Sequence, residues 1–207
     1  MPLIETTAAF FGLSLILGFT PGPDNLFVVV QAAANGRKAG LFVVLGLCTG
    51  LIVHTAAVAL GLAAVFAASA SAFVVLKFAG AAYLAYLAWQ AYRVPTCSPN
   101  QGADQAIPIT RLYRRGVFMN LTNPKVVLFF LAFLPQFVDP KLGSVALQLS
   151  WFGFVFIIAT LLAFGTITYL AAFFGQLLVG SALAQRLMNR TAALVFLGLA
   201  LRLLTAE

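Results

Sequence analysis

The stretch FTPGPDNLF, residues 19–27, interrupts a long run of Ala, Leu, Phe and Val with two prolines, a glycine and an aspartate. The apolar sequences AAFFGLSLILG and FVVVQAAA flank it, so the polar residues lie near the middle of a stretch long enough to cross a bilayer. Proline removes an amide donor and clashes with the preceding turn, which leaves backbone groups unpaired where water is absent. The stretch therefore predicts either a kink whose polar groups are satisfied by neighbouring helices, or a broken helix beside a polar cavity.

The composition excludes a water-soluble protein. Of the 207 residues, 62% are hydrophobic and 8% are charged, whereas soluble domains carry about 25% charged residues. We therefore predict an all-α integral membrane protein. We expect no cleaved signal peptide, because the first apolar segment is long and is followed by others of its kind. Cys48 lies in an apolar run and Cys97 in a polar one, so we expect them at different depths and unpaired.

Apolar runs long enough to cross a membrane occur six times along the chain. They lie at 4–33, 41–67, 72–92, 115–137, 145–178 and 191–204, taking about 20 residues as one span. Six transmembrane helices are the simplest interpretation, with the first and fourth broken by proline. The fifth run is long enough to be tilted or to continue along the membrane surface. We expect a single domain over 1–207, in which a polar linker at 94–112 joins the halves 1–93 and 113–207.

Positive charges predict the orientation of these helices. Eight of the 12 Lys and Arg residues fall on one side of the membrane: Arg37, Lys38, Arg93, Arg111, Arg114, Arg115, Arg186 and Arg190. Cytoplasmic loops collect Lys and Arg, so both termini are predicted on the periplasmic side and the linker on the cytoplasmic side. The formal net charge of +7 is then a topology signal and a contact with anionic membrane lipid, and we expect no nucleic-acid partner.

The two halves of the chain show a weak internal repeat. Shifting the sequence by about half its length aligns TPGPDNLF (20–27) with TNPKVVLF (122–129), and each half becomes three helices whose first is broken by proline. Three is an odd number, so the second half must be inverted relative to the first. Two inverted repeats of three helices are a common plan of secondary transporters.

Both breaks carry residues typical of helix starts. Asn123 suits a helix N-cap and Pro124 the first helical position, which would direct a positive helix end at the membrane centre. Asp24 is predicted to cap the second part of the first span in the same way.

Asp24 and Lys125 are the deepest charges by position in their spans, and charges at that depth are functional candidates. An acid in one half and a base in the other match the two ends of a zwitterion: its ammonium would bind Asp24, and its carboxylate would bind Lys125 and nearby helix amides. The alternative is a structural ion pair between the two residues. Both arrangements can alternate if the pair opens to admit a substrate. Lys77 lies near the end of its span, so we expect it to reach the headgroups.

The second predicted span carries a stripe of small residues. At about 100° per residue, Gly46, Gly50, His54 and Gly61 fall within about 80° of one another. Such a stripe lets another helix approach closely, and we expect a homodimer. His54, the one histidine of the chain, suits either a hydrogen-bonded packing role or proton exchange. Gly36, followed by Arg37 and Lys38, and Gly40 just beyond them indicate a loop and a helix boundary.

Enzyme chemistry finds little support. The sequence has no His and Cys cluster with metal-ligand spacing, no activated serine and no glycine-rich phosphate loop. We therefore expect a protein that is not an enzyme and has neither a bound metal nor a cofactor.

Several blocks together resemble the LysE/RhtB family of bacterial amino-acid exporters. The blocks are TPGPDN, NGRKAGL, GLCTG, LKFAGAAYLAYLAWQAYR and RRGVFMNLTNPKVVLFFLAFLPQFVDP, and the resemblance runs essentially end to end. It implies efflux of an amino acid or derivative of the threonine, homoserine or homoserine lactone class, coupled to protons, across the inner membrane. The family blocks fall on Pro21, Gly22, Pro23, Asp24 and Asn25, on Asn123, Pro124 and Lys125, and on Gly46 and Gly50.

Two other functions stay open. One is export of another small solute or ion on the same scaffold, and the other is a membrane assembly factor that transports nothing. Lys125 would repel a metal cation that entered beside Asp24, so the pair favours a zwitterion. A protein without transport activity would have no need of broken helices and opposed charges in its middle.

Overall fold

The computed structural model describes residues 2–68, 70–93, 107–180 and 182–205, and every regular element in these ranges is helical. The all-α prediction is thus confirmed for the described part of the chain. The helices are α1 (Ile4–Phe19), α2 (Pro23–Ala68), α3 (Ala70–Arg93), α4 (Ile109–Thr122), α5 (Pro124–Leu128), α6 (Val145–Gly180) and α7 (Ala182–Thr205). Between α5 and α6 lie a π-helical turn, η1 (Phe129–Phe133), and two 3-10 turns, η2 (Leu134–Phe137) and η3 (Pro140–Leu142).

The first predicted span, residues 4–33, consists of two helical pieces. α1 ends at Phe19, Thr20 is extended with a ψ of 121°, and α2 begins at Pro23. α2 is interrupted at Gly36, whose φ of 80° lies in the left-handed region that favours glycine. Gly36 therefore forms the predicted boundary between the first and second spans, whereas Gly40 lies within the helix that follows.

α4 begins earlier than the sequence predicts. The helix starts at Ile109, whereas the apolar run indicates a start at 115 and the linker was expected to extend to 112. The physical reason is that this helix is amphipathic: Leu112, Gly116 and Asn120 are buried at four-residue intervals. Its exposed side carries Arg111, Arg114 and Arg115. A search for apolar runs misses such a turn because its average composition is polar.

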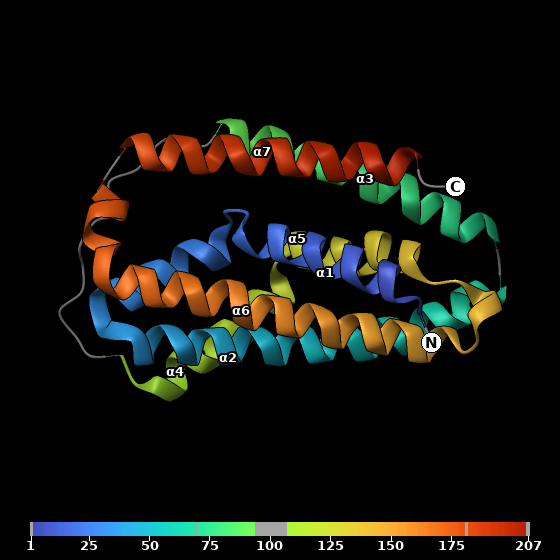
Figure 1. Cartoon of the computed structure of the whole chain (residues 1–207), viewed down its shortest axis with the longest axis horizontal. Helices are drawn as coiled ribbons and strands as arrows, with labels where there is room; N and C mark the ends of the chain where they lie inside the picture. The colour runs from blue at the N-terminus through green and yellow to red at the C-terminus, as the bar shows by residue number, and fades with distance from the viewer. Residues whose placement is uncertain (1, 69, 94–106, 181, 206–207) are drawn as a thin grey trace.

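The chain runs back and forth along the long axis of the bundle (Figure 1). α1 begins and α7 ends at the same end, on the right in that view, while α4 and α7 begin toward the opposite end. α1 and the first part of α2 run from the first end to the second, and the remainder of α2 returns. The break between α1 and α2 lies near the middle of this axis, close to α5.

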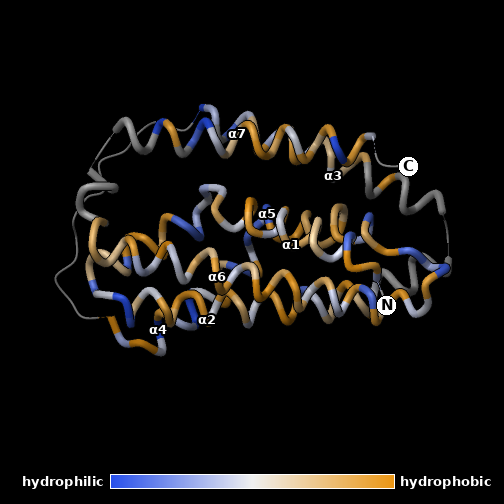
Figure 2. The backbone as a smooth tube through the Cα atoms, in the orientation of Figure 1, coloured by the Kyte–Doolittle hydropathy of each residue, from blue (hydrophilic) through white to orange (hydrophobic). Residues whose placement is uncertain are grey.

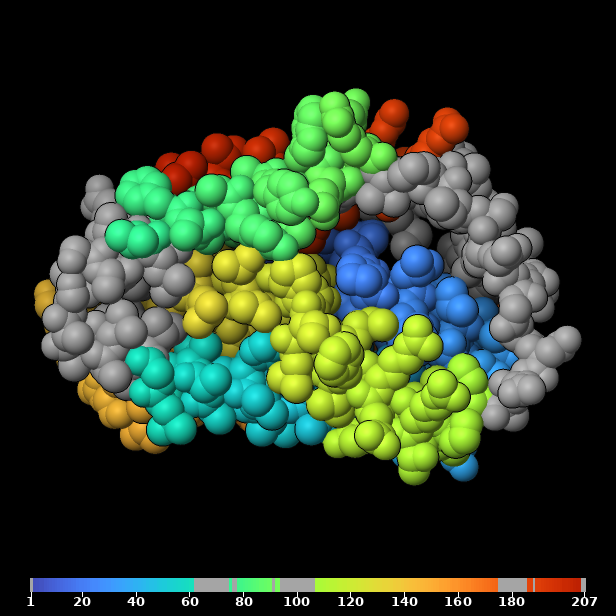
Figure 3. All heavy atoms as spheres, turned by 180° about the vertical axis from the view of Figure 1, so that it is seen from behind, coloured from blue at the N-terminus to red at the C-terminus, as the bar shows by residue number. Residues whose placement is uncertain are grey.

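Four helix pairs account for most of the packing. α2 packs against α6 and α4, α1 packs against α6, and α3 packs against α7. α3 and α7 lie side by side along one flank of the molecule (Figure 1). Seen from behind, α3 (green) rests on the segment that contains η1 (yellow), which separates it from α2 (cyan) (Figure 3). The η1 segment therefore lies inside the bundle, between α2 and α3, whereas α4 lies at its edge (Figure 1).

Two described helices are long and apolar enough to cross a membrane on their own, at Pro23–Gly61 and Val145–Phe174. A third candidate span results if two pieces that meet at a 49° bend, Ile109–Thr122 and Pro124–Phe137, are counted as one crossing. α1, at 16 residues, is too short alone. The described residues thus support a multi-pass membrane protein, whereas six crossings stay a prediction.

Hydrophobic residues dominate the helices between the two ends of the bundle (Figure 2). At the end opposite the termini, arginines lie over aromatic rings. The Arg37 guanidinium carbon is 4.3 Å from the ring centre of Tyr169 and 4.1 Å from that of Phe173, both on α6. The Arg115 guanidinium carbon is 4.6 Å from the ring centre of Phe27. Each such contact contributes about 0.5–1 kcal/mol at an exposed site. The contacts of Arg37 hold the chain beside the Gly36 interruption against α6, and the contact of Arg115 holds α4 against the first part of α2.

A layer of phenylalanine rings fills the space between α1, α6 and the η1–η2 segment. We call it the phenylalanine layer, and it comprises Phe10, Phe129, Phe133, Phe137, Phe152 and Phe156. Neighbouring ring centres are 4.9–6.4 Å apart, within the range in which aromatic pairs attract. Phe10 and Phe152 are completely buried. The layer occupies the part of the bundle between its middle and the end that holds the termini.

Candidate functional site

The break at Thr20–Gly22 leaves the last carbonyl groups of α1 without helical partners. The Thr20 amide and hydroxyl both donate to the Ile16 carbonyl, at 2.9 and 2.7 Å. Asn25 of α2 reaches back, and its Nδ2 donates to the Gly18 carbonyl at 2.7 Å. The side chains around the break therefore satisfy part of the backbone polarity that Pro21 exposes.

The second break has the form predicted for a helix start. α4 ends at Thr122, and the Asn123 Oδ1 accepts a hydrogen bond from the Lys125 amide at 3.0 Å, with Pro124 in the first helical position. The cap prediction is confirmed for Asn123. Asp24 differs from its predicted role because α2 already begins at Pro23, one residue earlier. Its Oδ1 accepts from the Asn25 amide at 3.1 Å, which places the carboxylate in the first turn instead of the cap position.

Asp24 and Lys125 meet at the two breaks. The Lys125 Nζ lies 3.5 Å from the Asp24 Oδ1, and the two side chains are 6% and 5% exposed, respectively. Residues 101 positions apart in the sequence thus form a buried ion pair in the middle of the bundle. The contact is longer than the roughly 2.7–2.9 Å of a tight charge-assisted hydrogen bond. Hydrogen bonds between described residues use only the Oδ1 of this carboxylate.

Lys125 also binds carbonyl groups at the end of α1. Its Nζ lies 3.2 Å from the Thr20 carbonyl oxygen, 3.5 Å from that of Leu17 and 3.5 Å from the Asn25 Oδ1. With Asp24, these groups offer four acceptors to three N–H donors. The carbonyl end of a helix carries partial negative charge, so an ammonium there is favourable even without the carboxylate. The same lysine therefore serves both the ion pair and the broken backbone.

Gly22 permits this close arrangement. A Cβ at this position would lie 2.7 Å from the Asp24 Oδ1 and 3.2 Å from the Lys125 Nζ. A side chain would therefore push the carboxylate away from the ammonium. The prolines act differently: Pro23 and Pro124 are exposed, so they shape the backbone and do not face the ion pair.

A small cavity of about 20 Å³ lies beside the ion pair. That volume holds about one water molecule and is too small for an amino acid. Its polar lining comes from Asp24, Lys125, Asn120 and Thr160, and its apolar lining includes Leu17, Leu47, Leu51, Val126, Phe156 and Phe164. The Asn120 Oδ1 is buried without a hydrogen-bond partner among the described residues. A substrate can enter only if the ion pair and the surrounding helices separate.

Asn120 and Thr160 are site residues that the sequence interpretation missed. Asn120 lies one helical turn before Asn123, on the same face, and Thr160 is a buried polar residue within the apolar α6. Polar residues inside the predicted spans were the available signal. The sequence interpretation selected charged residues, Asp24 and Lys125, and therefore passed over these two uncharged ones.

The predicted proton residue His54 lies outside this cavity lining. Its Nε2 is 3.3 Å from the Asn120 backbone oxygen, and its ring centre is 5.6 Å from that of Phe130. His54 is therefore linked to the cavity indirectly, through Asn120 and through the contact of Phe130 with Phe156. Among the described residues, no three His, Cys, Asp or Glu side chains lie close enough together to hold a metal ion.

The predicted glycine stripe packs inside the chain. Gly46 faces Gly116 of α4, where a Cβ on Gly116 would lie 3.2 Å from the Gly46 Cα. Gly50 faces Asn120, whose Cβ would lie 2.7 Å from an added Cβ. Gly61 is exposed, with open space around it. The helix-packing role of Gly46 and Gly50 is thus accounted for by α4, and they are not available as a dimer surface. The homodimer stays a prediction without this support.

Comparisons with known proteins find similar membrane proteins over most of the chain. A family model described as "LysE type translocator" matches residues 15–207. The chain is 35% identical over 138 residues to a homoserine/homoserine lactone efflux protein of Salmonella typhimurium, covering 67% of each protein. It is 26% identical over 201 residues to a leucine efflux protein of Salmonella choleraesuis, covering 94% of this chain and 92% of the relative. An uncharacterized membrane protein of Vibrio cholerae is 29% identical over 209 residues, covering 99% and 98%. No solved structure matches the chain.

Proposed function

Because the chain belongs to the family of LysE type translocators, we propose that it exports a zwitterionic amino acid or a close derivative from the bacterial cytoplasm across the inner membrane. Two of its relatives are named for efflux of homoserine and homoserine lactone, and of leucine. The observation that carries the proposal is the buried pair of Asp24 and Lys125 at two broken helices. An ion pair at this depth is expensive to maintain, which favours a functional role.

The pair presents complementary charges to a zwitterion. When it opens, the cargo ammonium replaces Lys125 beside Asp24, and the cargo carboxylate replaces Asp24 beside Lys125. Every buried charge then has an opposite partner both before and after binding. This exchange keeps the energetic cost of opening low, since neither side chain is left buried and unpaired. Asn120 and Thr160 add hydrogen-bonding groups on the cavity wall.

Proton exchange is proposed to involve Asp24 directly. After the cargo leaves, a proton on the carboxylate compensates the charge until the ion pair with Lys125 forms again. His54 lies beyond Asn120, so we assign it a secondary part in which it relays protons toward the cavity. Coupling to the proton gradient follows if the cargo and the proton occupy Asp24 in turn.

The packing pattern supports two inverted repeats, residues 1–93 and 113–207. Exchanging the halves converts the contact of α1 with α6 into the contact of α4 with α2, and both contacts exist. The same exchange maps the pairs α2–α6 and α3–α7 onto themselves. We propose that the ion pair lies on the axis relating the repeats, where inverted-repeat transporters place their substrate.

Labelling of single cysteines tests the proposed orientation. In a chain in which Cys48 and Cys97 are replaced, Ser144→Cys should react with an impermeant thiol reagent added to intact cells, because residue 144 lies at the predicted periplasmic end. Thr110→Cys, at the start of α4, should react only after the membrane is disrupted. Both positions are exposed, so access to the reagent depends on the side of the membrane. Labelling of Thr110→Cys in intact cells would show that the termini are cytoplasmic.

Transport into inside-out vesicles tests the function itself. Vesicles that contain the protein should accumulate one or more labelled amino acids from a panel including homoserine, threonine, leucine and lysine, with vesicles lacking the protein as the control. Accumulation should require an acidic lumen and stop when a protonophore is added. Uptake of the whole panel at the control rate would contradict the proposal. Uptake of metal ions instead would favour the alternative of an ion exporter.

A further inference from the structure

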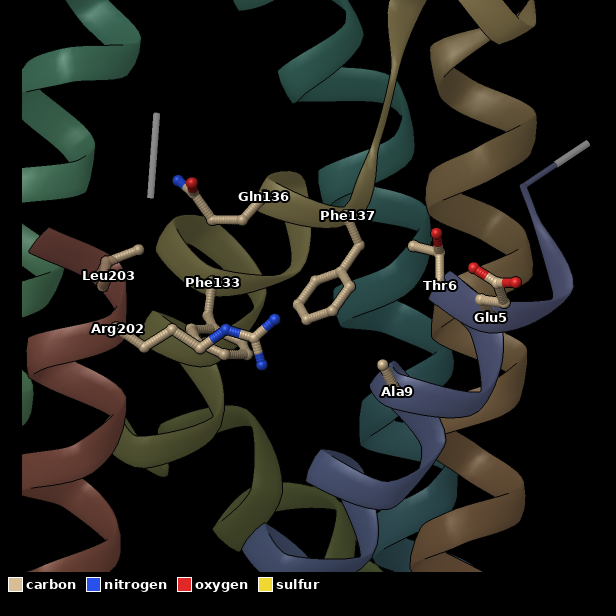
Figure 4. Close-up of a pocket in the computed structure, with 8 residues that line it drawn as sticks. All are labelled: Glu5, Thr6, Ala9, Phe133, Gln136, Phe137, Arg202 and Leu203. Carbon is tan, nitrogen blue, oxygen red and sulfur yellow. The ribbon is translucent and has the colours of Figure 1, made fainter. Parts of the chain in front are cut away.

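A second, larger cavity opens at the end of the bundle that holds the termini. Its volume is about 360 Å³, within the range of small-molecule binding pockets. α1, the η1–η2 segment and α7 form its walls (Figure 4). Buried Phe133 and Leu203 form part of its lining, and Phe137 and Ala9 add further apolar surface. We call this space the outer pocket.

The outer pocket contains two opposite charges that do not pair with each other. Glu5 comes from the first turn of α1 and Arg202 from the last turn of α7. The pair of Asp24 and Lys125 is the one ion pair among the described residues, so Glu5 and Arg202 stand apart across the cavity. Figure 4 shows them on either side of Phe137, and the Arg202 guanidinium carbon is 5.3 Å from the centre of that ring. Thr6 and Gln136 supply further polar groups in the lining.

The phenylalanine layer separates this pocket from the central cavity. Phe156 lines the central cavity, while Phe133 and Phe137 line the outer pocket. Phe129 bridges them, with its ring centre 4.9 Å from that of Phe156 and 5.0 Å from that of Phe133. Phe129 and Phe133 belong to η1. In this π-helical turn the Leu134 amide donates a hydrogen bond to the Phe129 carbonyl. Isolated π-helical turns are frequent at functional sites. Two cavities with charged residues in their linings therefore lie on opposite sides of the phenylalanine layer.

We propose that the outer pocket is a second binding site for the zwitterionic cargo, where Arg202 binds its carboxylate and Glu5 its ammonium. The inference rests on the proposed function, because it places the pocket on the exit side of the same route. The arrangement repeats the chemistry of the central pair, with an acid and a base from different halves of the chain. Here the charges are already apart, so the site accepts cargo without breaking an ion pair. Movement of Phe129 and Phe133 would connect the two sites.

Competition from outside the membrane tests the outer pocket. Right-side-out vesicles loaded with a labelled amino acid found to be transported should release it more slowly as the unlabelled compound is added outside, because the outer site becomes occupied. Arg202→Gln and Glu5→Gln should each raise the external concentration for half-maximal slowing by about tenfold or more. Arg202→Lys should restore much of the effect. Arg190→Gln, which removes an exposed charge near the other end of the same helix, should leave it unchanged.

Two results would overturn the inference. One is an unchanged half-maximal concentration in both Arg202→Gln and Glu5→Gln, and the other is an equal shift in Arg190→Gln. A lipid headgroup with an ammonium and a phosphate presents the same pair of charges as the cargo. If the effect of Arg202→Gln disappears when phosphatidylethanolamine is replaced by phosphatidylglycerol, the pocket holds a headgroup and the inference is wrong.

Direct binding separates this inference from the proposed function. Purified Lys125→Gln protein, whose central site is impaired, should still bind labelled homoserine weakly at the outer pocket. Arg202→Gln added to that protein should remove this binding. If the wild type transports nothing while this Arg202-dependent binding persists, the proposed function fails and the outer site stands. If transport occurs but no binding depends on Arg202, the outer site fails alone.

Discussion

Lys125→Gln should abolish export of a free amino acid while leaving part of the export of its methyl ester. The glutamine keeps a polar side chain but cannot neutralise the cargo carboxylate, and it leaves Asp24 free to bind the ammonium. Losing one partner of a buried charge pair costs about 2–5 kcal/mol, so transport of the free acid should fall by at least about 30-fold. Uptake of the two compounds into inside-out vesicles gives the ratio directly.

Asp24→Asn should have the complementary effect. It preserves the shape of the side chain but removes the charge that binds the cargo ammonium and exchanges protons. Accumulation driven by the proton gradient should disappear for both the free acid and the ester. Lys141→Gln, which removes an exposed charge from the turn before α6, serves as the control and should transport normally. A Lys125→Gln protein that loses free acid and ester equally would contradict selective recognition of the carboxylate.

Stability must be measured on the same variants. A purely structural ion pair predicts that each single change leaves one uncompensated buried charge and destabilises the protein by about 3–5 kcal/mol. Lys125→Gln also removes the ammonium from the carbonyl end of α1, so some destabilisation is expected in either case. Thermal stability in detergent and expression level therefore accompany each transport rate, and the rates are compared per folded molecule.

Gly46→Leu should prevent stable folding. A Cβ at this position would collide with the Tyr113 carbonyl oxygen and lie 2.9 Å from the Val117 amide nitrogen and 3.0 Å from the Gly116 Cα. All three are backbone atoms of α4, which cannot move aside as a flexible side chain can. The cost should exceed about 3 kcal/mol, the upper end of typical overpacking, because the two helices would have to separate.

Gly61→Leu is the matched control for this prediction. Gly61 lies on the same helix, is exposed and has no atom within 4 Å of an added Cβ. Replacing it should leave the melting temperature in detergent unchanged or slightly higher, since leucine favours helix more than glycine does. If the Gly46→Leu protein has the same melting temperature as the Gly61→Leu protein, α2 and α4 do not pack as closely as described.

The broken helices could be predicted from the sequence because proline acts locally. Pro21 and Pro23 prevent a continuous helix whatever surrounds them, and Asn123 with Pro124 specifies a helix start through bonds within three residues. The meeting of Asp24 with Lys125 was suggested by their depth in corresponding spans. It required the additional assumption that the two halves face each other, which only three-dimensional packing could test.

Other features depend on long-range packing and were therefore missed or misassigned. Asn120 lines the cavity because Gly50 leaves space for its side chain, a relation between residues on two helices. The stripe of Gly46 and Gly50 indicated close packing correctly, but sequence alone does not say whether the partner is α4 or a second copy of the chain. Glu5 and Arg202 lie almost 200 residues apart, at the beginning of α1 and the end of α7. Neither stands in a recognisable motif, so their shared pocket became visible only in the fold.

The most direct test of the central claim is the rate at which the Asp24→Asn/Lys125→Gln double variant transports a free amino acid into inside-out vesicles. The double change leaves no buried charge unpaired, so folding should recover relative to the single variants. We predict that transport nevertheless stays near the rate of vesicles without the protein, because no group remains to bind either end of the zwitterion. A rate near that of the wild type would show that the two charges only hold the helices together, and that residues 20–25 act as a hinge through their backbone.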